Sequence, residues 1–138
     1  MSTTNNQRAL ALAPMFGIAG WAAENVFFGP RFSGAFGKHH VPFLPVYALG
    51  SLAMLAIAPK ISRWSPLARA AVYATTGGVV EFLGAQVDRE LLKKRSWNYE
   101  ANDALSRATE GAVDWSHAAL WGGLGLLGEK ILPAGKGR

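Results

Sequence analysis

Eighteen consecutive uncharged residues, VPFLPVYALGSLAMLAIA from Val41 to Ala58, decide the fold that the sequence predicts. This stretch falls within the roughly 17–25 apolar residues that a helix needs to cross a bilayer. Three further stretches with few charges lie on either side of it, at about 9–28, 70–87 and 113–132. We therefore predict an all-α fold, a polytopic membrane helix bundle with four transmembrane spans.

The composition favours a single integral membrane domain over residues 1–138. Half of the residues are hydrophobic and 17% are charged, whereas about 25% is the usual charged share in soluble proteins. The alternative is a soluble helical domain, but helices that are apolar on all sides belong in large cores or in lipid. A chain of 138 residues has no such core, and it leaves no room for a separate catalytic domain.

The basic residues lie mainly between the apolar stretches. A net charge of +5 in this arrangement favours anionic lipid headgroups over nucleic acid as the partner. The connection PKISRWSP carries Lys60, Arg63 and Trp64 without an acid, which is typical of a membrane interface. Glu129 and Lys130 are expected to form a pair at the membrane edge. Lysine and arginine divide seven against seven between the two sides, which leaves the membrane orientation open. The expected location is a bacterial or archaeal cytoplasmic membrane.

The segment before the last span predicts an additional helix along the membrane interface. Asp103 has the character of an N-cap residue. Behind it an apolar stripe follows the helical period, formed by Leu105, Ala108, Ala112 and Trp115. We expect this interfacial helix to turn into the final span.

Acidic residues within the apolar stretches are the strongest functional leads, because a charge at membrane depth is expensive and usually faces a bundle interior. Glu24, Glu81 and Asp114 occupy such positions, and His117 lies one turn after Asp114. Small residues share their helix faces: Gly17 and Gly20 with Glu24, Gly77 and Gly84 with Glu81, Gly125 and Gly128 with Asp114. Glycine allows neighbouring helices to approach closely. The carboxylates are therefore expected to meet in a shared interior.

Two interpretations of this polar group remain open from the sequence. The side chains could hydrogen-bond one another and only fix the packing. Alternatively, paired carboxylates could act as acid and base or bind a cation, with Glu24, Glu81, Asp114 and His117 as the catalytic candidates. Further candidates for a substrate or ion site are Trp21, Asp88, Trp97, Tyr99 and Trp121.

No motif in the sequence indicates a cofactor or a metal ion. The chain has no cysteine and no HExxH motif, so a metal site is not predicted. It also has no P-loop, nucleophile elbow or dinucleotide fingerprint. These absences exclude an ATPase subunit but leave a permease partner open.

Four short motifs carry a resemblance to a known family: GWAAE at 20–24, PFLPVYALGS at 42–51, VEFLGAQVDREL at 80–91 and WNY at 97–99. With these motifs in this order the chain resembles the putative ABC-transporter type IV family of small membrane proteins, over about residues 15–132. It departs from the family pattern in GPRFSGAFGKHH after the first motif and in NDALSRATE after the last. The resemblance implies a helical membrane protein with Glu24, Glu81, Trp97 and Tyr99 at motif positions.

The sequence predicts an accessory or scaffold subunit of a membrane complex with a link to transport. Its expected partners are the lipid bilayer and either other membrane subunits or further copies of the chain. The alternative is an intramembrane enzyme, or a transporter coupled to protons or cations. In that case Glu24 and Glu81 would act on a hydrophobic or lipid-like substrate.

Overall fold

The computed structural model describes residues 14, 15, 17–20, 22, 43–93, 97–99 and 103–131, without the side chains of 43–45 and 92. Its main helices are α3 (Phe43–Ile61), α4 (Pro66–Leu92), α5 (Ala104–Ala108) and α6 (Trp115–Ile131). Residues 14–22 are also helical where they are described. This part of the chain contains no strand, so the predicted all-α class is confirmed.

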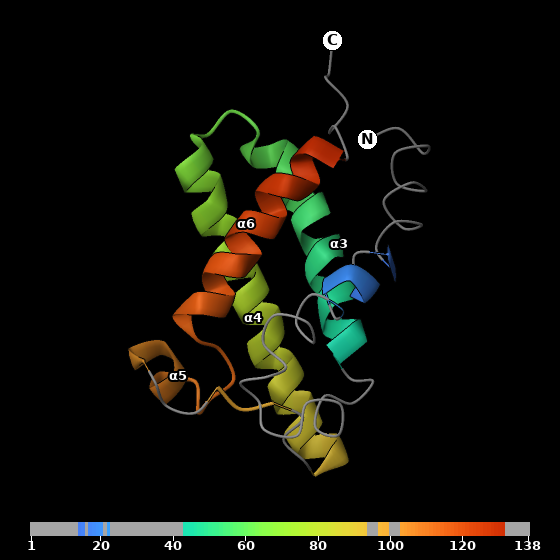
Figure 1. The fold of residues 1–138 in the computed structure, drawn as a ribbon, viewed down its shortest axis with the longest axis vertical. Coiled ribbons are helices and arrows are strands. Elements are labelled where there is room, and N and C mark those ends of the chain that lie inside the picture. The colour runs from blue at the N-terminus through green and yellow to red at the C-terminus, as the bar shows by residue number, and fades with distance from the viewer. Residues whose placement is uncertain are drawn as a thin grey trace.

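Helix α4 is the central element of the bundle. It packs most extensively against α6 and also against α3. Figure 1 shows that α3 and α6 both run opposite to α4, so the turn between α3 and α4 and the end of α6 lie at the same end. We call this the turn end, comprising residues 59–69 and 128–131. The opposite end, with residues 88–93, 97–99 and 103–114, is called the α5 end.

Local sequence sets both limits of α4. Ser65 has extended backbone angles and its hydroxyl accepts a hydrogen bond from the backbone N–H of Ala68 at 3.3 Å, as an N-cap residue does. Pro66 follows at the first helical position, where its missing N–H costs nothing. Lys93 ends the helix in the left-handed conformation, with φ 52° and ψ 31°.

The helix predicted after Asp103 is present but much shorter than expected. Asp103 caps α5, and a reciprocal capping box joins it to Ser106. The helix ends at Ala108, because Glu110 and Gly111 adopt positive φ values of 53° and 79°. The predicted stripe that continues to Trp115 was therefore wrong, since two left-handed residues break the helical period.

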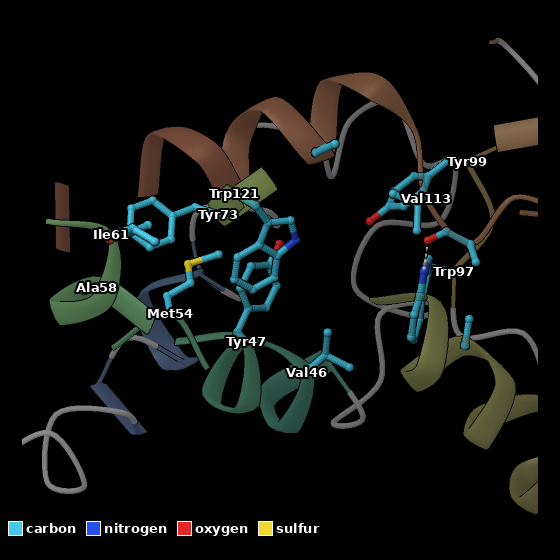
Figure 2. Close-up of a cluster of buried hydrophobic side chains, with 13 residues drawn as sticks. Val46, Tyr47, Met54, Ala58, Ile61, Tyr73, Trp97, Tyr99, Val113 and Trp121 are labelled. Atoms are coloured by element: carbon cyan, nitrogen blue, oxygen red, sulfur yellow. Dashed lines mark hydrogen bonds between the residues drawn. The ribbon is translucent and has the colours of Figure 1, made fainter. Parts of the chain in front are cut away.

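At the centre of the core, the indole ring of Trp121 packs closely against glycine residues. Trp121 of α6 is 2% exposed and stacks on Tyr47 of α3 with ring centroids 4.9 Å apart. A Cβ atom built on Gly77 of α4 would lie 2.1 Å from Trp121 Cγ. Figure 2 shows Trp121 among Tyr47, Met54 and Tyr73, while Trp97, Tyr99 and Val113 lie toward the other side of the cluster.

The predicted inward glycine faces are confirmed for most of the positions that the structure describes. Gly77 and Gly84 of α4 approach Trp121 and Val46, and Gly125 of α6 approaches Tyr73. Gly17 and Gly20 are also buried. Gly128 is the exception, because a Cβ atom there would meet nothing within 4 Å.

The helices overlap three of the four predicted spans, and most of the first span, at about 9–28, lies outside the described residues. Among the helices described within 43–131, none is long and apolar enough to cross a membrane. Thr75, Thr76, Glu81 and Gln86 interrupt the apolar run of α4, and α6 is 17 residues long. The predicted transmembrane character is therefore not supported by these helices.

Candidate functional site

A fully buried carboxylate lies in the middle of α4. Glu81 is 0% exposed, because its position continues the inward face that begins at Tyr73 and Gly77. The hydroxyl of Tyr99 donates a hydrogen bond to Glu81 Oε1 at 3.1 Å. A buried carboxylate requires such partners, and Tyr99 fixes the orientation of this one.

The segment that carries Tyr99 is held in place by the chain just before α6. The backbone N–H of Tyr99 donates to Gly111 O at 2.9 Å, and Trp97 Nε1–H donates to Ala112 O at 3.0 Å. Gly111 has φ +79°, and a Cβ atom there would lie 1.8 Å from Asn98 Oδ1. Only glycine meets both conditions without strain. Gly111 thus allows residues 97–99 to pack against α4.

His117 and Asp114 form the second half of the site. The carboxylate oxygen Oδ1 of Asp114 accepts bonds from the His117 backbone N–H at 2.7 Å and from His117 Nδ1–H at 2.8 Å. Because the carboxylate can only accept, this bond places the proton on Nδ1 of the ring. The His117 ring stacks on Tyr99 with centroids 3.9 Å apart and an interplanar angle of 23°. Tyr99 therefore contacts both Glu81 and His117.

Hydrogen bonds lower the pKa of two carboxyls at this end of the bundle. Burial alone would raise the pKa of Asp114, which precedes α6, but the bonds from His117 outweigh it and the pKa is lowered. For Asp103, the backbone N–H groups of Trp115 and Ser106, which donate at 3.0 and 2.8 Å, lower the pKa. Asp103 in this way joins the beginnings of α5 and α6.

The lowered pKa of Asp103 predicts a specific loss of stability in acid. A carboxyl whose folded pKa is below its unfolded value, 3.8, stabilises the fold above that value, and the contribution is lost as pH falls through the folded pKa. Asp103→Asn keeps one acceptor but places an amide group opposite the Trp115 N–H. We expect a lower Tm than wild type at pH 7 and a Tm difference that narrows as the pH falls from the unfolded pKa of 3.8 through the lower folded pKa. Thermal unfolding across this pH range checks the prediction, and a constant Tm difference would contradict it.

The four side chains form a path from the interior toward the surface. Glu81 is fully buried, Tyr99 bridges it to His117, and the Asp114 carboxyl at the far end is 14% exposed. Such a set can hold a proton or a small cation at the Glu81 carboxylate, which the hydrogen bond from Tyr99 orients. Within the described residues, no three His, Asp or Glu side chains gather as metal ligands.

The remaining predicted site residues are placed differently. Asp88 and Trp97 line a small pocket at the α5 end together with Arg89 and Glu110. Its volume of about 10 Å³ is roughly room for one water molecule. Trp121 lies in the packed core. Glu24 and Trp21 lie outside the described residues, so the predicted meeting of Glu24 with Glu81 stays a prediction.

A second polar cluster, at the turn end, was not anticipated. The Tyr73 hydroxyl donates to Glu129 Oε1 at 2.5 Å, and Arg69 Nε lies 3.1 Å from the same oxygen. The expected edge pair of Glu129 with Lys130 was therefore wrong, because Glu129 turns toward α4. Arg69 and Glu129 are 60 positions apart in the sequence. No local pattern joins them, and only the antiparallel packing of α4 and α6 brings them together.

Comparison with known proteins places the chain in a family. The family described as putative ABC-transporter type IV matches residues 14–134, which includes all four residues of the candidate site. No curated protein matches the chain. No solved structure matches it either.

Proposed function

The chain belongs to the putative ABC-transporter type IV family, and we propose on that basis that it is a membrane-embedded accessory subunit of a transport-related complex. In this role the chain binds other subunits and lipid through its outer surface. The polar side chains inside the bundle hold its helices together. One observation carries the proposal, namely the absence of charge on the outward face of α4.

Large apolar side chains follow the outward face of α4 at every fourth position. Val79, Leu83, Val87 and Leu91 are each more than half exposed. Between Arg69 and Arg89 the charged residues of α4 are Glu81 and Asp88, and both are buried. This polarity is the reverse of that of a surface helix in water, which turns its charges outward.

The length of the stretch of α4 between its charged ends is close to the thickness of a bilayer interior. Residues 70–87 of α4 are 18 residues, which span about 27 Å at about 1.5 Å per residue. The hydrocarbon core of a bilayer is about 30 Å thick. On the facing helices, residues 43–59 and 118–128 also carry no charge. Lipid or an apolar subunit would contact this outward face rather than the buried carboxylates.

Fractionation followed by a mass measurement tests the proposal. After an alkaline carbonate wash, the full chain should remain with the membranes and should require detergent for release. Purified in mild detergent, it should migrate as a complex heavier than the 14.7 kDa chain. Recovery in the carbonate supernatant would refute membrane embedding, and a lone 14.7 kDa protomer would refute the subunit role.

A second candidate function is favoured by the geometry at Glu81. A carboxylate that is 0% exposed and held by a tyrosine hydroxyl is suited to proton transfer or to coupling transport to a cation. The predicted partner Glu24 would then supply the second carboxylate. The reaction would take place inside the bundle, with Tyr99 and His117 orienting Glu81.

Amide variants separate this second function from simple packing. Glu81→Gln keeps the size of the side chain and an acceptor for Tyr99, so we expect it to fold. If Glu81 transfers a proton, the phenotype that a gene deletion reveals should be restored about 10²–10⁴ times less efficiently. Glu24→Gln should behave alike, and the double variant should be little worse than the worse single variant.

Glu90→Gln is the matched control, since it removes an exposed carboxylate from the same helix. It should restore the phenotype like wild type. Full activity of both Glu81→Gln and Glu24→Gln would eliminate the second candidate function and leave the accessory role standing.

A further inference from the structure

Apart from Glu81, the charged residues of the described chain lie at the two ends of the bundle, and among the described residues these ends differ in net charge. At the turn end, the described residues include four cations and one acid: Lys60, Arg63, Arg69, Lys130 and Glu129. At the α5 end they include three cations and five acids: Arg89, Lys93, Arg107, Asp88, Glu90, Asp103, Glu110 and Asp114. Lysine and arginine divide evenly over the whole sequence, so the asymmetry lies in the positions of the acids.

At the turn end, the one described acid is already engaged. Glu129 binds Arg69 and Tyr73, and Arg69 also donates to the backbone oxygens of the turn. Lys60 and Arg63 are exposed, and no ion pair joins either of them to an acid within the described residues. Their charges are therefore available to an anionic partner.

Apolar side chains stand beside these cations. Trp64 is 52% exposed and Leu67 is 81% exposed. Leu67 lies in the first turn of α4, the helix whose later turns carry the exposed Val79, Leu83 and Val87. A tryptophan and cations at the end of an apolar surface match the headgroup region of a bilayer, where indole rings lie and basic side chains reach phosphates.

Two of the described cations at the α5 end are paired with acids. Arg89 binds Glu110, and Lys93 lies 3.7 Å from Glu90. The carboxylates of Asp103 and Asp114 accept hydrogen bonds from backbone N–H groups of the protein. Among the residues that the structure describes at this end, acids outnumber cations, so it offers a control of similar size and exposure.

We infer that the turn end, through Lys60, Arg63, Trp64 and Leu67, is a binding surface for anionic phospholipid headgroups. This inference rests on the proposed membrane embedding. The cations contact the phosphates, and the two apolar side chains enter the acyl region next to them. The α5 end has no such preference.

Lipid retention by the full chain tests the inference. The protein is reconstituted into nanodiscs that contain phosphatidylcholine and phosphatidylglycerol, and the lipids that stay bound are identified by native mass spectrometry. Wild type should retain phosphatidylglycerol preferentially. A basic residue near an anionic surface contributes about 1 kcal/mol, or about fivefold, so Lys60→Gln with Arg63→Gln should lower the preference about 25-fold.

The control is the pair Lys93→Gln and Arg107→Gln, which removes the same charge from the α5 end. Its preference for phosphatidylglycerol should equal that of wild type. Equal losses in both double variants, or no loss in either, would overturn the inference while leaving membrane embedding intact. Failure of the wild-type chain to enter nanodiscs of any composition would overturn the proposed function and the inference with it.

Discussion

Replacing Trp121 with alanine should lower the free energy of unfolding by about 3–5 kcal/mol, the range for a buried aromatic side chain. The indole, which belongs to α6, is 2% exposed and contacts both other long helices, α3 and α4. It stacks on Tyr47 of α3 and fills the space above Gly77 of α4. Its removal opens a cavity at the point where these helices meet, and helices pinned by backbone contacts relax only partly into such a cavity.

Denaturant unfolding of the purified protein in mild detergent gives the measurement. Trp115→Ala serves as the control, because Trp115 begins the same helix but is 60% exposed. Its truncation should change the unfolding free energy by less than about 0.5 kcal/mol. Similar effects from the two variants would show that Trp121 is not the packing centre of the bundle.

The second large effect is expected at Gly77. A methyl group there would overlap the root of the Trp121 side chain, with Cγ at 2.1 Å and Cβ at 2.6 Å. These atoms cannot turn away without moving α6. Gly77→Ala should therefore destabilise the protein by about 1–3 kcal/mol, the usual result of overpacking a core.

Gly123→Ala is the matched control on α6, because nothing lies within 4 Å of a Cβ atom at that position. It should stabilise the helix by up to about 1 kcal/mol, the difference between glycine and alanine in a helix interior. In a Trp121→Ala background the penalty of Gly77→Ala should disappear, since contacting residues are not additive. A penalty that persists there would place the strain elsewhere.

Much of the helical framework could be predicted from sequence pattern alone. Small residues at helical spacing around Glu81 predicted the inward face of α4, and Asp103 predicted a helix start that the structure contains. These features depend on residues within one or two turns of each other. Local physical chemistry, meaning capping and the period of the helix, is therefore sufficient to find them.

The rest depended on contacts between distant residues or on backbone geometry. Nothing near Glu129 in the sequence indicates Arg69 as its partner, and the left-handed backbone at Glu110 ended α5 where the apolar stripe continued. Trp121 was a site candidate because it lies one turn from His117, yet its neighbours are core residues. The link between Glu81 and His117 through Tyr99 required the fold of the 97–113 segment.

The ion pair between Arg69 and Glu129 also bears on the order of events during synthesis. Sixty residues separate the two partners, and translation adds about 5–20 residues per second. For about 3–12 s after Arg69 is synthesised, Glu129 has not yet been added to the chain. For most of that interval Gly77 also lacks the indole of Trp121, which packs against it in the folded chain. Until α6 is synthesised, the nascent hairpin of α3 and α4 therefore exposes the surface against which α6 later packs. A chaperone or a partner subunit could bind that surface first.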